Sequence, residues 1–190
     1  MLKRSTSVRS ALSFACTLLG VAPAAPARKL VARTGDPIPY RIALPEEAEI
    51  EVRPGLLAAQ TGNLSIIVVA TDMLEGEPNP LPLPEAESRR ILTSIIMGSD
   101  ALLFALLDEE FRRRKLELGN VVRGIGTLGG QRSACVRGPF EERGVKGWLD
   151  MHATVKGGIM YTLAFTVLGD DMAPHEALLA RIHDAFALPR

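Results

Sequence analysis

A single apolar segment in the first half of the chain most constrains its fold. Residues 64–70 read Leu-Ser-Ile-Ile-Val-Val-Ala, so the segment is rich in β-branched residues and nearly all apolar. A strand with one face in water alternates apolar and polar residues, whereas a strand covered on both faces is apolar almost throughout. The segment therefore predicts a strand inside a sheet that has further layers above and below it.

Further strands and helices are predicted around this segment. Short strands over 38–44 and 50–53 precede it, and a helical pattern of apolar residues runs from 85 to 115. Gly98-Ser99-Asp100 interrupts that pattern, either as a kink or as a break at which Asp100 caps a second helix. Pro174 begins a closing helix. Between the helices we predict four strands, over 116–123, 131–137, 145–155 and 159–168, divided by glycine-rich joints at 124–130, 138–144 and 156–158.

Together these elements predict an α/β (α+β) fold, in which a curved antiparallel sheet of about six to seven strands is sandwiched by helices. The sheet and helices form a single domain over 38–190, preceded by a lead-in segment over 28–37. Prolines at 78, 80, 82 and 84 predict a stiff, extended connector, because alternate prolines exclude a sheet interior. About 150 residues suffice for one hydrophobic core.

The first 27 residues have the order of a secretory signal peptide. Lys3, Arg4 and Arg9 make a basic start, 11–22 is apolar, and Ala25-Pro26-Ala27 places small residues at a cleavage position. The apolar run of about twelve residues is shorter than the roughly 20 that span a bilayer as a helix. We therefore expect one cleavage near Ala27, at a site whose small residues are Ala25 and Ala27, and an exported protein, either periplasmic or secreted.

The charge and cysteine content of the remaining chain narrow the class of protein. The whole sequence has 22 basic and 22 acidic residues, and the leader removes three basic ones, which leaves a net charge near −3. That weak acidity argues against a nucleic-acid partner, which needs a clustered basic surface. No later apolar run has the length of a transmembrane span. Cys16 lies in the leader and Cys135 is the only cysteine after it, so no internal disulfide is expected.

Two features resemble parts of known functional sites but lack the structural surroundings that those sites need. Gly124-Ile125-Gly126-Thr127-Leu128-Gly129 matches the G-x-G-x-x-G string of dinucleotide sites, but that chemistry needs the glycines to open a helix, and here a strand follows. Cys135 lies in the middle of that strand, where a cysteine is most often a small packing residue. His175 and His183 lie eight residues apart on the closing helix, too far apart to share a ligand, and are expected on its solvated face.

The strand over 145–156 gives the best candidate for a binding site. Its odd positions are apolar or small, and its even positions put Trp148, Asp150 and His152 on one face. Trp148 is the only tryptophan of the chain, and tryptophan often anchors interfaces. We therefore predict a recognition patch at these three residues, unless a helix or the N-terminal segment covers Trp148. Asp150 and His152 are two metal ligands, which is too few to define a metal site.

The order of the elements resembles a known fold family. The C-terminal third carries the resemblance, with the strand Gly158-Ile159-Met160-Tyr161-Thr162-Leu163, a short acidic loop, and a helix that ends Ile182-His183-Asp184-Ala185-Phe186. Over most of residues 38–188 the chain resembles the PsbP-like α/β/α sandwich, a family that includes an extrinsic photosystem II protein, a Ran-binding nuclear-import factor and DcrB-like envelope proteins. The resemblance implies a domain that binds or helps assemble larger machines rather than catalyses, and it assigns no functional residue.

These observations predict a non-catalytic binding or assembly module of the cell envelope with a protein partner and no cofactor. The alternative is a small-molecule or metal-binding enzyme that uses the sheet face of Asp150 and His152. The sequence lacks the paired carboxylates, triads and multi-ligand metal motifs that such an enzyme uses. A structural envelope protein is a third alternative. Metal-dependent quenching of Trp148 fluorescence would favour the enzyme.

Overall fold

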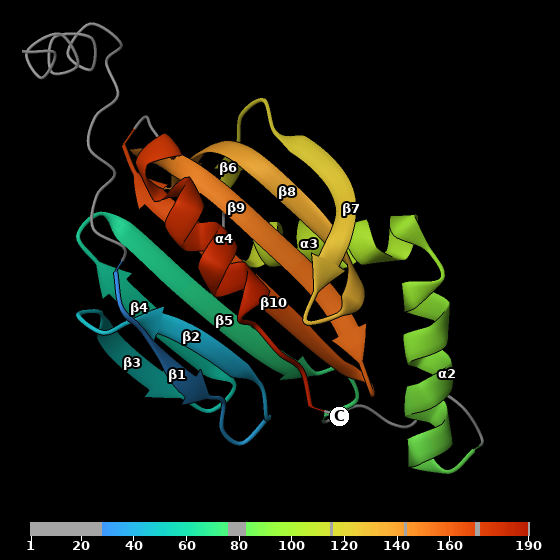
Figure 1. Ribbon diagram of the computed structural model, residues 1–190. Coiled ribbons are helices and arrows are strands. Elements are labelled where there is room, and N and C mark those ends of the chain that lie inside the picture. Colours follow the sequence, from blue (N-terminus) through green and yellow to red (C-terminus); the bar gives the residue numbers. More distant parts are fainter. Residues whose placement is uncertain (1–27, 76–82, 115, 143, 170–171, 190) are drawn as a thin grey trace, which may run out of the picture.

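The computed structural model describes residues 28–75, 83–114, 116–142, 144–169 and 172–189. The predicted leader, with Ala25 and Ala27, and the prolines at 78, 80 and 82 lie outside the described residues. The described chain forms one large antiparallel sheet, a separate two-stranded sheet, three α-helices and the short 3₁₀ helix Ala173–His175 (Figure 1). The element order and the sheet agree with the predicted fold class.

The large sheet is eight-stranded and all its paired strands are antiparallel. Two consecutive strands, β6 and β7, both pair with the outer edge of β8, so the sheet is seven strands wide, as expected. Its order across the sheet is β3 (Glu49–Arg53), β4 (Leu56–Thr61), β5 (Leu64–Asp72), β10 (Ile159–Leu168), β9 (Val145–Lys156), β8 (Gln131–Glu142), and then β6 (Glu117–Leu118) and β7 (Val122–Leu128).

One face of the sheet is covered by a hairpin and a helix. The hairpin consists of β1 (Leu30–Thr34) and β2 (Arg41–Pro45), and the helix is α4 (Glu176–Asp184). Leu179 and Ile182 of α4 are buried in this core, and the ring of Phe186 stacks on Tyr40 at 5.8 Å between centroids. The expected lead-in over 28–37 therefore contains a strand. It was missed because β1 is short and half-exposed and is recognisable only through its partner β2.

The other face is covered by α2 (Glu85–Met97) and α3 (Asp100–Arg114), which pack over β8 and β9. The two helices meet at 97°, so the predicted interruption is a break. The Oγ of Ser99, and not Asp100, accepts the backbone N–H of Leu102 at 3.3 Å, while Asp100 forms an ion pair with Arg132. In the described part of the chain no single helix has the length and apolarity of a membrane span, whereas α2 and α3 taken together do.

The two faces of the sheet are not covered equally. In β5, Ile66 and Val68 are buried beneath the face that carries α4, whereas Ile67 and Val69 point to the opposite face and are half-buried. The reason is that α2 and α3 lie over β8 and β9, and no helix of the described residues packs over the β3–β4–β5 side of that face (Figure 1). The expectation that residues 64–70 are covered on both sides is therefore correct for one face only.

Several strand boundaries differ from those predicted. The strand expected over 116–123 is split into β6 and β7, and the expected loop at 124–130 is mostly strand, with the turn confined to Gly129 and Gly130 at φ 57° and 77°. β8 continues through the expected joint at 138–144 as far as Glu142, because it pairs with β9 along that whole length. β4 was missed because its alanines and glutamine give little strand signal.

Candidate functional site

The candidate site lies on the α4 side of β8 and β9, where the sheet continues beyond the helix. Cross-strand partners in an antiparallel pair point to the same face, so the register fixes which side chains lie together. Four such pairs follow one another along the two strands. They are Cys135 and His152, Arg137 and Asp150, Pro139 and Trp148, and Glu141 and Lys146. The structure thus places Trp148, Asp150 and His152 on one face, as the alternation predicts.

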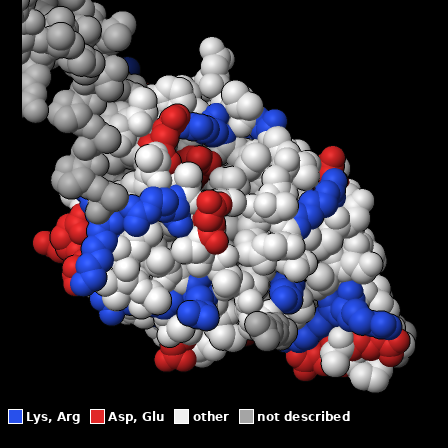
Figure 2. Space-filling model, viewed as in Figure 1, with Lys and Arg blue, Asp and Glu red and all other residues white. Residues whose placement is uncertain are grey.

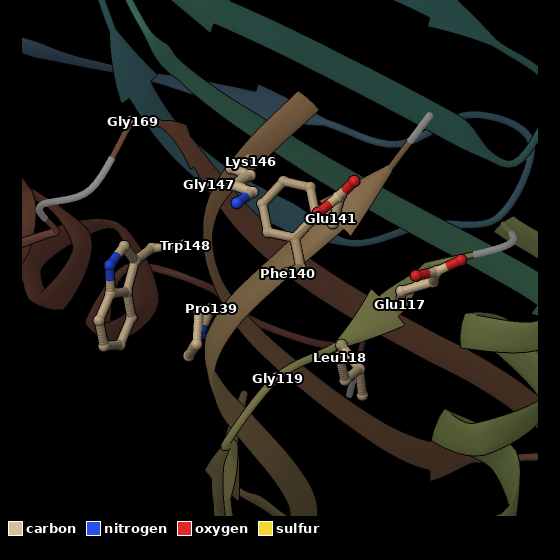
Figure 3. Close-up of a pocket in the computed structure, with 10 residues that line it drawn as sticks. All are labelled: Glu117, Leu118, Gly119, Pro139, Phe140, Glu141, Lys146, Gly147, Trp148 and Gly169. Atoms are coloured by element: carbon tan, nitrogen blue, oxygen red, sulfur yellow. The ribbon is translucent and has the colours of Figure 1, made fainter. Parts of the chain in front are cut away.

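Trp148 lies in a recess at the end of this sheet, of about 350 Å³. Figure 3 shows its indole and the ring of Pro139 next to each other, with Glu117 and Glu141 at the other side. The side chain of Trp148 is half-buried and packs against the core on the α4 side. The lining residues are Glu117, Leu118, Gly119, Pro139, Phe140, Glu141, Lys146, Gly147, Trp148 and Gly169.

Two glycines allow the strands to meet around this recess. A Cβ on Gly147 would lie 2.4 Å from the backbone oxygen of Val167 and 2.8 Å from Cε1 of Phe140. A Cβ on Gly119 would lie 3.0 Å from Cγ of Pro139. A larger residue at Gly147 would collide with the backbone of the neighbouring strand, whereas at Gly119 the ring of Pro139 would have to shift by a few tenths of an ångström. The shape of the recess therefore depends mainly on Gly147.

The charged side chains of the recess form a row across three strands. Glu117 of β6 lies opposite Glu141 of β8, which in turn lies opposite Lys146 of β9. The row therefore carries two carboxylates and one ammonium group, an excess of one negative charge at neutral pH. Around it, basic and acidic side chains occur in small mixed groups on the α4 side of the molecule, with uncharged atoms between them (Figure 2).

Asp150 and His152 lie under α4 in a second pocket, of about 290 Å³. Nε2 of His152 lies 3.0 Å from Oδ1 of Asp150, and both side chains are mostly buried. The His152 ring contacts the ring of His183 on α4 at 4.7 Å between centroids, and Nε2 of His183 donates to the backbone oxygen of Thr127 at 2.8 Å. The pocket is lined by Arg137, Asp150, His152, Phe165, Glu176, Leu179, Ala180 and His183.

The expectation that His183 lies on the solvated face of the closing helix is therefore wrong. Its side chain connects α4 to the sheet, because the helix turns that residue toward His152 and β7. Sequence reasoning also missed Arg137, whose Nη2 lies 2.5 Å from Oε1 of Glu176 on α4. The register of β8 against β9 was the only signal that could have placed Arg137 beside Asp150, and it depends on the full length of β8.

Two properties limit the chemistry available at this second pocket: the protonation of the Cys135 thiol beside it and the number of side chains that could bind a metal ion. Burial, followed by the negative charge of Asp150, raises the pKa of the Cys135 thiol, which keeps it in the less nucleophilic thiol form. Nδ1 of His152 is buried and has no hydrogen-bond partner among the described residues. In the same part of the chain no group of three His, Cys, Asp or Glu side chains is arranged to hold a metal ion.

A scan against protein-family models gives no match, and neither does a search of curated proteins. The search of solved structures gives matches of low sequence identity. Cyanobacterial PsbP (CyanoP) from Synechocystis sp. PCC 6803 is 12% identical with a TM-score of 0.47, over 90% of this chain and 96% of that one. PA94 from Pseudomonas aeruginosa, a protein of unknown function, is 12% identical with a TM-score of 0.45, over 85% and 97% of the two chains.

A third similar structure is LpqN of Mycobacterium tuberculosis, which is described as involved in cell envelope biogenesis. It is 14% identical with a TM-score of 0.42, over 86% of this chain and 92% of that one. At such low identities the similarity concerns the fold, and a shared fold does not identify a function.

Proposed function

We propose that this protein is an exported, non-catalytic binding module of the cell envelope whose binding site is the Trp148 recess. The site would take an apolar side chain of a protein partner, with a basic residue of that partner next to it. The observation that carries the proposal is the position of the chain's only tryptophan, half-buried beside Pro139 in a recess at the end of the sheet.

The geometry of the recess supports a side chain as its occupant. Its volume of about 350 Å³ is near the lower end of small-molecule pockets, which measure roughly 300–1,000 Å³. Tryptophan is enriched among residues that dominate binding energy, because it offers a large rigid surface at low cost in conformational entropy. The indole and Pro139 supply the apolar wall, while Glu117 and Glu141 lie at the other side (Figure 3).

The charge of the recess supports a basic neighbour on the partner. Glu117 and Glu141 lie opposite each other on adjacent strands, and like charges in that position destabilise a free sheet. An Arg or Lys of a partner would relieve this repulsion. The expected net charge of the exported chain, near −3, would favour encounter with a basic partner.

Affinity capture with matched variants tests this function. The purified protein would be incubated with the exported fraction of its source cells, cross-linked and analysed by mass spectrometry. We expect a partner that is retained by the wild type and by Trp148→Phe but lost from Trp148→Ala. Val52→Ala, at a position 58% exposed on β3 at the opposite edge of the sheet, serves as the control and retains the partner. Equal capture by Trp148→Ala would refute the proposed site.

One observation favours the second candidate function, a small-molecule enzyme. Nε2 of His152 lies 3.0 Å from Oδ1 of Asp150 in the pocket under α4, and a neighbouring His and carboxylate are an arrangement used for general acid–base catalysis. The protonated thiol of Cys135 and the lack of a third ligand in the described residues leave that pair without a nucleophile or a metal. The binding module is therefore the better supported of the two functions.

A further inference from the structure

The structure has a second surface that goes beyond the Trp148 recess. We propose that the open side of the sheet, over β3, β4 and β5 and the adjoining ends of β9 and β10, docks a basic amphipathic helix of a partner protein. This surface, which we call the open face, lies on the same side of the sheet as α2 and α3. Those helices pack over β8 and β9 and leave it uncovered.

Several residues that point to the open face are apolar, whereas a sheet face in contact with water carries mainly polar residues. Leu56 and Ala58 of β4 and Ile67 and Val69 of β5 share this side of the sheet and are half-buried. An antiparallel sheet with one face in water normally alternates apolar residues inward with polar residues outward. Here the side that carries no helix is apolar as well, which is typical of a surface that another element covers.

Two adjoining hollows make this surface concave. One, of about 390 Å³, lies over β3, β4 and β5, and the other, of about 360 Å³, lies over β5, β10 and the start of β9. Ser65 and Ile67 line both, so the two hollows are adjacent, and we call them together the trough. At its far end Val145 and Leu168 are 49% and 46% exposed, although both are large apolar residues.

The charge around the trough indicates what it would bind. The side chains that line the two hollows include three carboxylates, Glu49, Glu51 and Glu142, and no Lys, Arg or His. Arg53 lies 2.5 Å from Glu51 and offsets one of these charges. The floor also carries the uncharged polar residues Gln60, Ser65 and Thr166, but most of its lining is apolar. A largely apolar floor with an acidic rim is complementary to a helix that has one apolar stripe flanked by Lys and Arg.

A helix fits better than an added strand because of where the trough lies. Strands join a sheet at its edge, whereas this surface is the face of the sheet. Helices pack on sheet faces, and α2 and α3 already form a helical layer on the other half of this one (Figure 1). A partner helix over β4 and β5 would continue that layer and bury the apolar side chains that it leaves exposed.

Fluorescence anisotropy with a labelled peptide tests the proposal. The probe is an 18-residue peptide of Leu and Lys at helical spacing, and its control is a peptide of the same composition in scrambled order. We expect the wild type to bind the amphipathic probe at least tenfold more tightly than the scrambled one. The double variant Val145→Glu/Leu168→Glu should lose at least tenfold in affinity, as should Ile67→Glu.

Control variants with substitutions outside the trough test whether the peptide binds at the open face and not elsewhere on the protein. Val52→Glu and Val122→Glu introduce the same charge at positions that are 58% and 74% exposed outside the trough, and they should bind the probe as the wild type does. Glu142→Lys should weaken binding several-fold without adding a buried charge. Trp148→Ala should leave probe binding unchanged, so a failure of the open face and a failure of the proposed function can be told apart. Circular dichroism and thermal melts confirm that each variant is folded.

Other occupants of the open face are outcomes that would overturn the proposal. Equal affinity for the two peptides, or wild-type binding by Val145→Glu/Leu168→Glu, would show that the trough does not hold a helix. Self-association of the free wild type that this double variant abolishes would identify a second copy of the chain instead. Binding to vesicles of phosphatidylglycerol and phosphatidylethanolamine, abolished by the same substitutions, would identify a lipid surface instead.

Discussion

Gly147 and Phe140 lie directly opposite one another on β9 and β8, with the Phe140 ring in the space where a Gly147 side chain would be. Phe140 is buried in the core beneath α3, while the neighbouring residue Trp148 points to the opposite side of the sheet. Because Gly147 has no side chain, the Phe140 ring can pack against the β9 backbone on the α3 side, and the same stretch of backbone carries Trp148 on the other side.

Gly147→Ala should destabilise the protein by about 1–3 kcal/mol, because overpacking forces neighbouring groups to move. The new Cβ would lie 2.4 Å from the backbone oxygen of Val167, which cannot rotate away. Urea unfolding followed by circular dichroism measures the change. Gly126→Ala is the matched control, since its Cβ would find Oγ of Ser133 at 3.8 Å and no closer atom. A Gly147→Ala variant as stable as the wild type would contradict the packing described here.

The Asp72–Arg89 pair predicts how stability depends on pH at the end of β5. Nη1 and Nη2 of Arg89 donate to the two carboxylate oxygens of Asp72 at 2.7 and 2.8 Å. The hydrogen bond from Arg89 lowers the pKa of Asp72 below its ordinary value of 3.8. A lowered pKa means that the pair stabilises the fold above about pH 4 and that this contribution is lost as pH falls through the folded-state pKa.

Asp72→Asn should remove roughly 1.5 kcal/mol of stability at pH 7, and the difference should shrink as the pH falls, because the wild-type carboxyl becomes protonated as the pH passes through its lowered pKa. Urea unfolding of both proteins at several pH values between 2.5 and 7 gives the difference. Glu46→Gln, which alters the exposed pair with Lys29, should change stability little at any pH. A difference between Asp72→Asn and wild type that does not shrink with acidification would contradict the assignment.

Metal titration separates the binding module from the enzyme alternative. Zn²⁺ at micromolar concentration should leave the fluorescence of Trp148 unchanged, because Asp150 and His152 have no third ligand arranged around them in the described chain. His152→Ala should behave like the wild type in this titration. Quenching in the wild type that His152→Ala abolishes would instead support a metal site under α4.

The sequence was most informative where local rules set the structure. Alternation over 145–155 correctly placed Trp148, Asp150 and His152 on one face, and the paired glycines at 157 and 158 form the predicted tight turn, with φ of 61° and 78°. The break before Asp100 was one of two predicted alternatives. These features depend on side-chain period and on backbone conformations that glycine allows, which a sequence states directly.

Features that depend on distant contacts could not be predicted. His183 faces His152 only because α4 crosses the sheet at that point, and 30 residues of chain lie between the two histidines. The apolar run over 64–70 indicated that both faces of its strand need cover. It did not indicate that α2 and α3 would cover β8 and β9 and leave Ile67 and Val69 half-exposed. Alternation tells which faces are apolar, and tertiary packing decides which element covers them.

A photo-cross-linking amino acid at position 146 tests the central claim most directly, because Lys146 is an exposed lining residue of the Trp148 recess. Irradiation in the source cells should give one discrete adduct, with a mass set by the partner, and Trp148→Ala in the same chain should abolish it. The same amino acid at position 52, on the opposite edge of the sheet, should give no such adduct. An adduct at 52 but none at 146, or an adduct at 146 that survives Trp148→Ala, would contradict the assignment of this recess as the binding site.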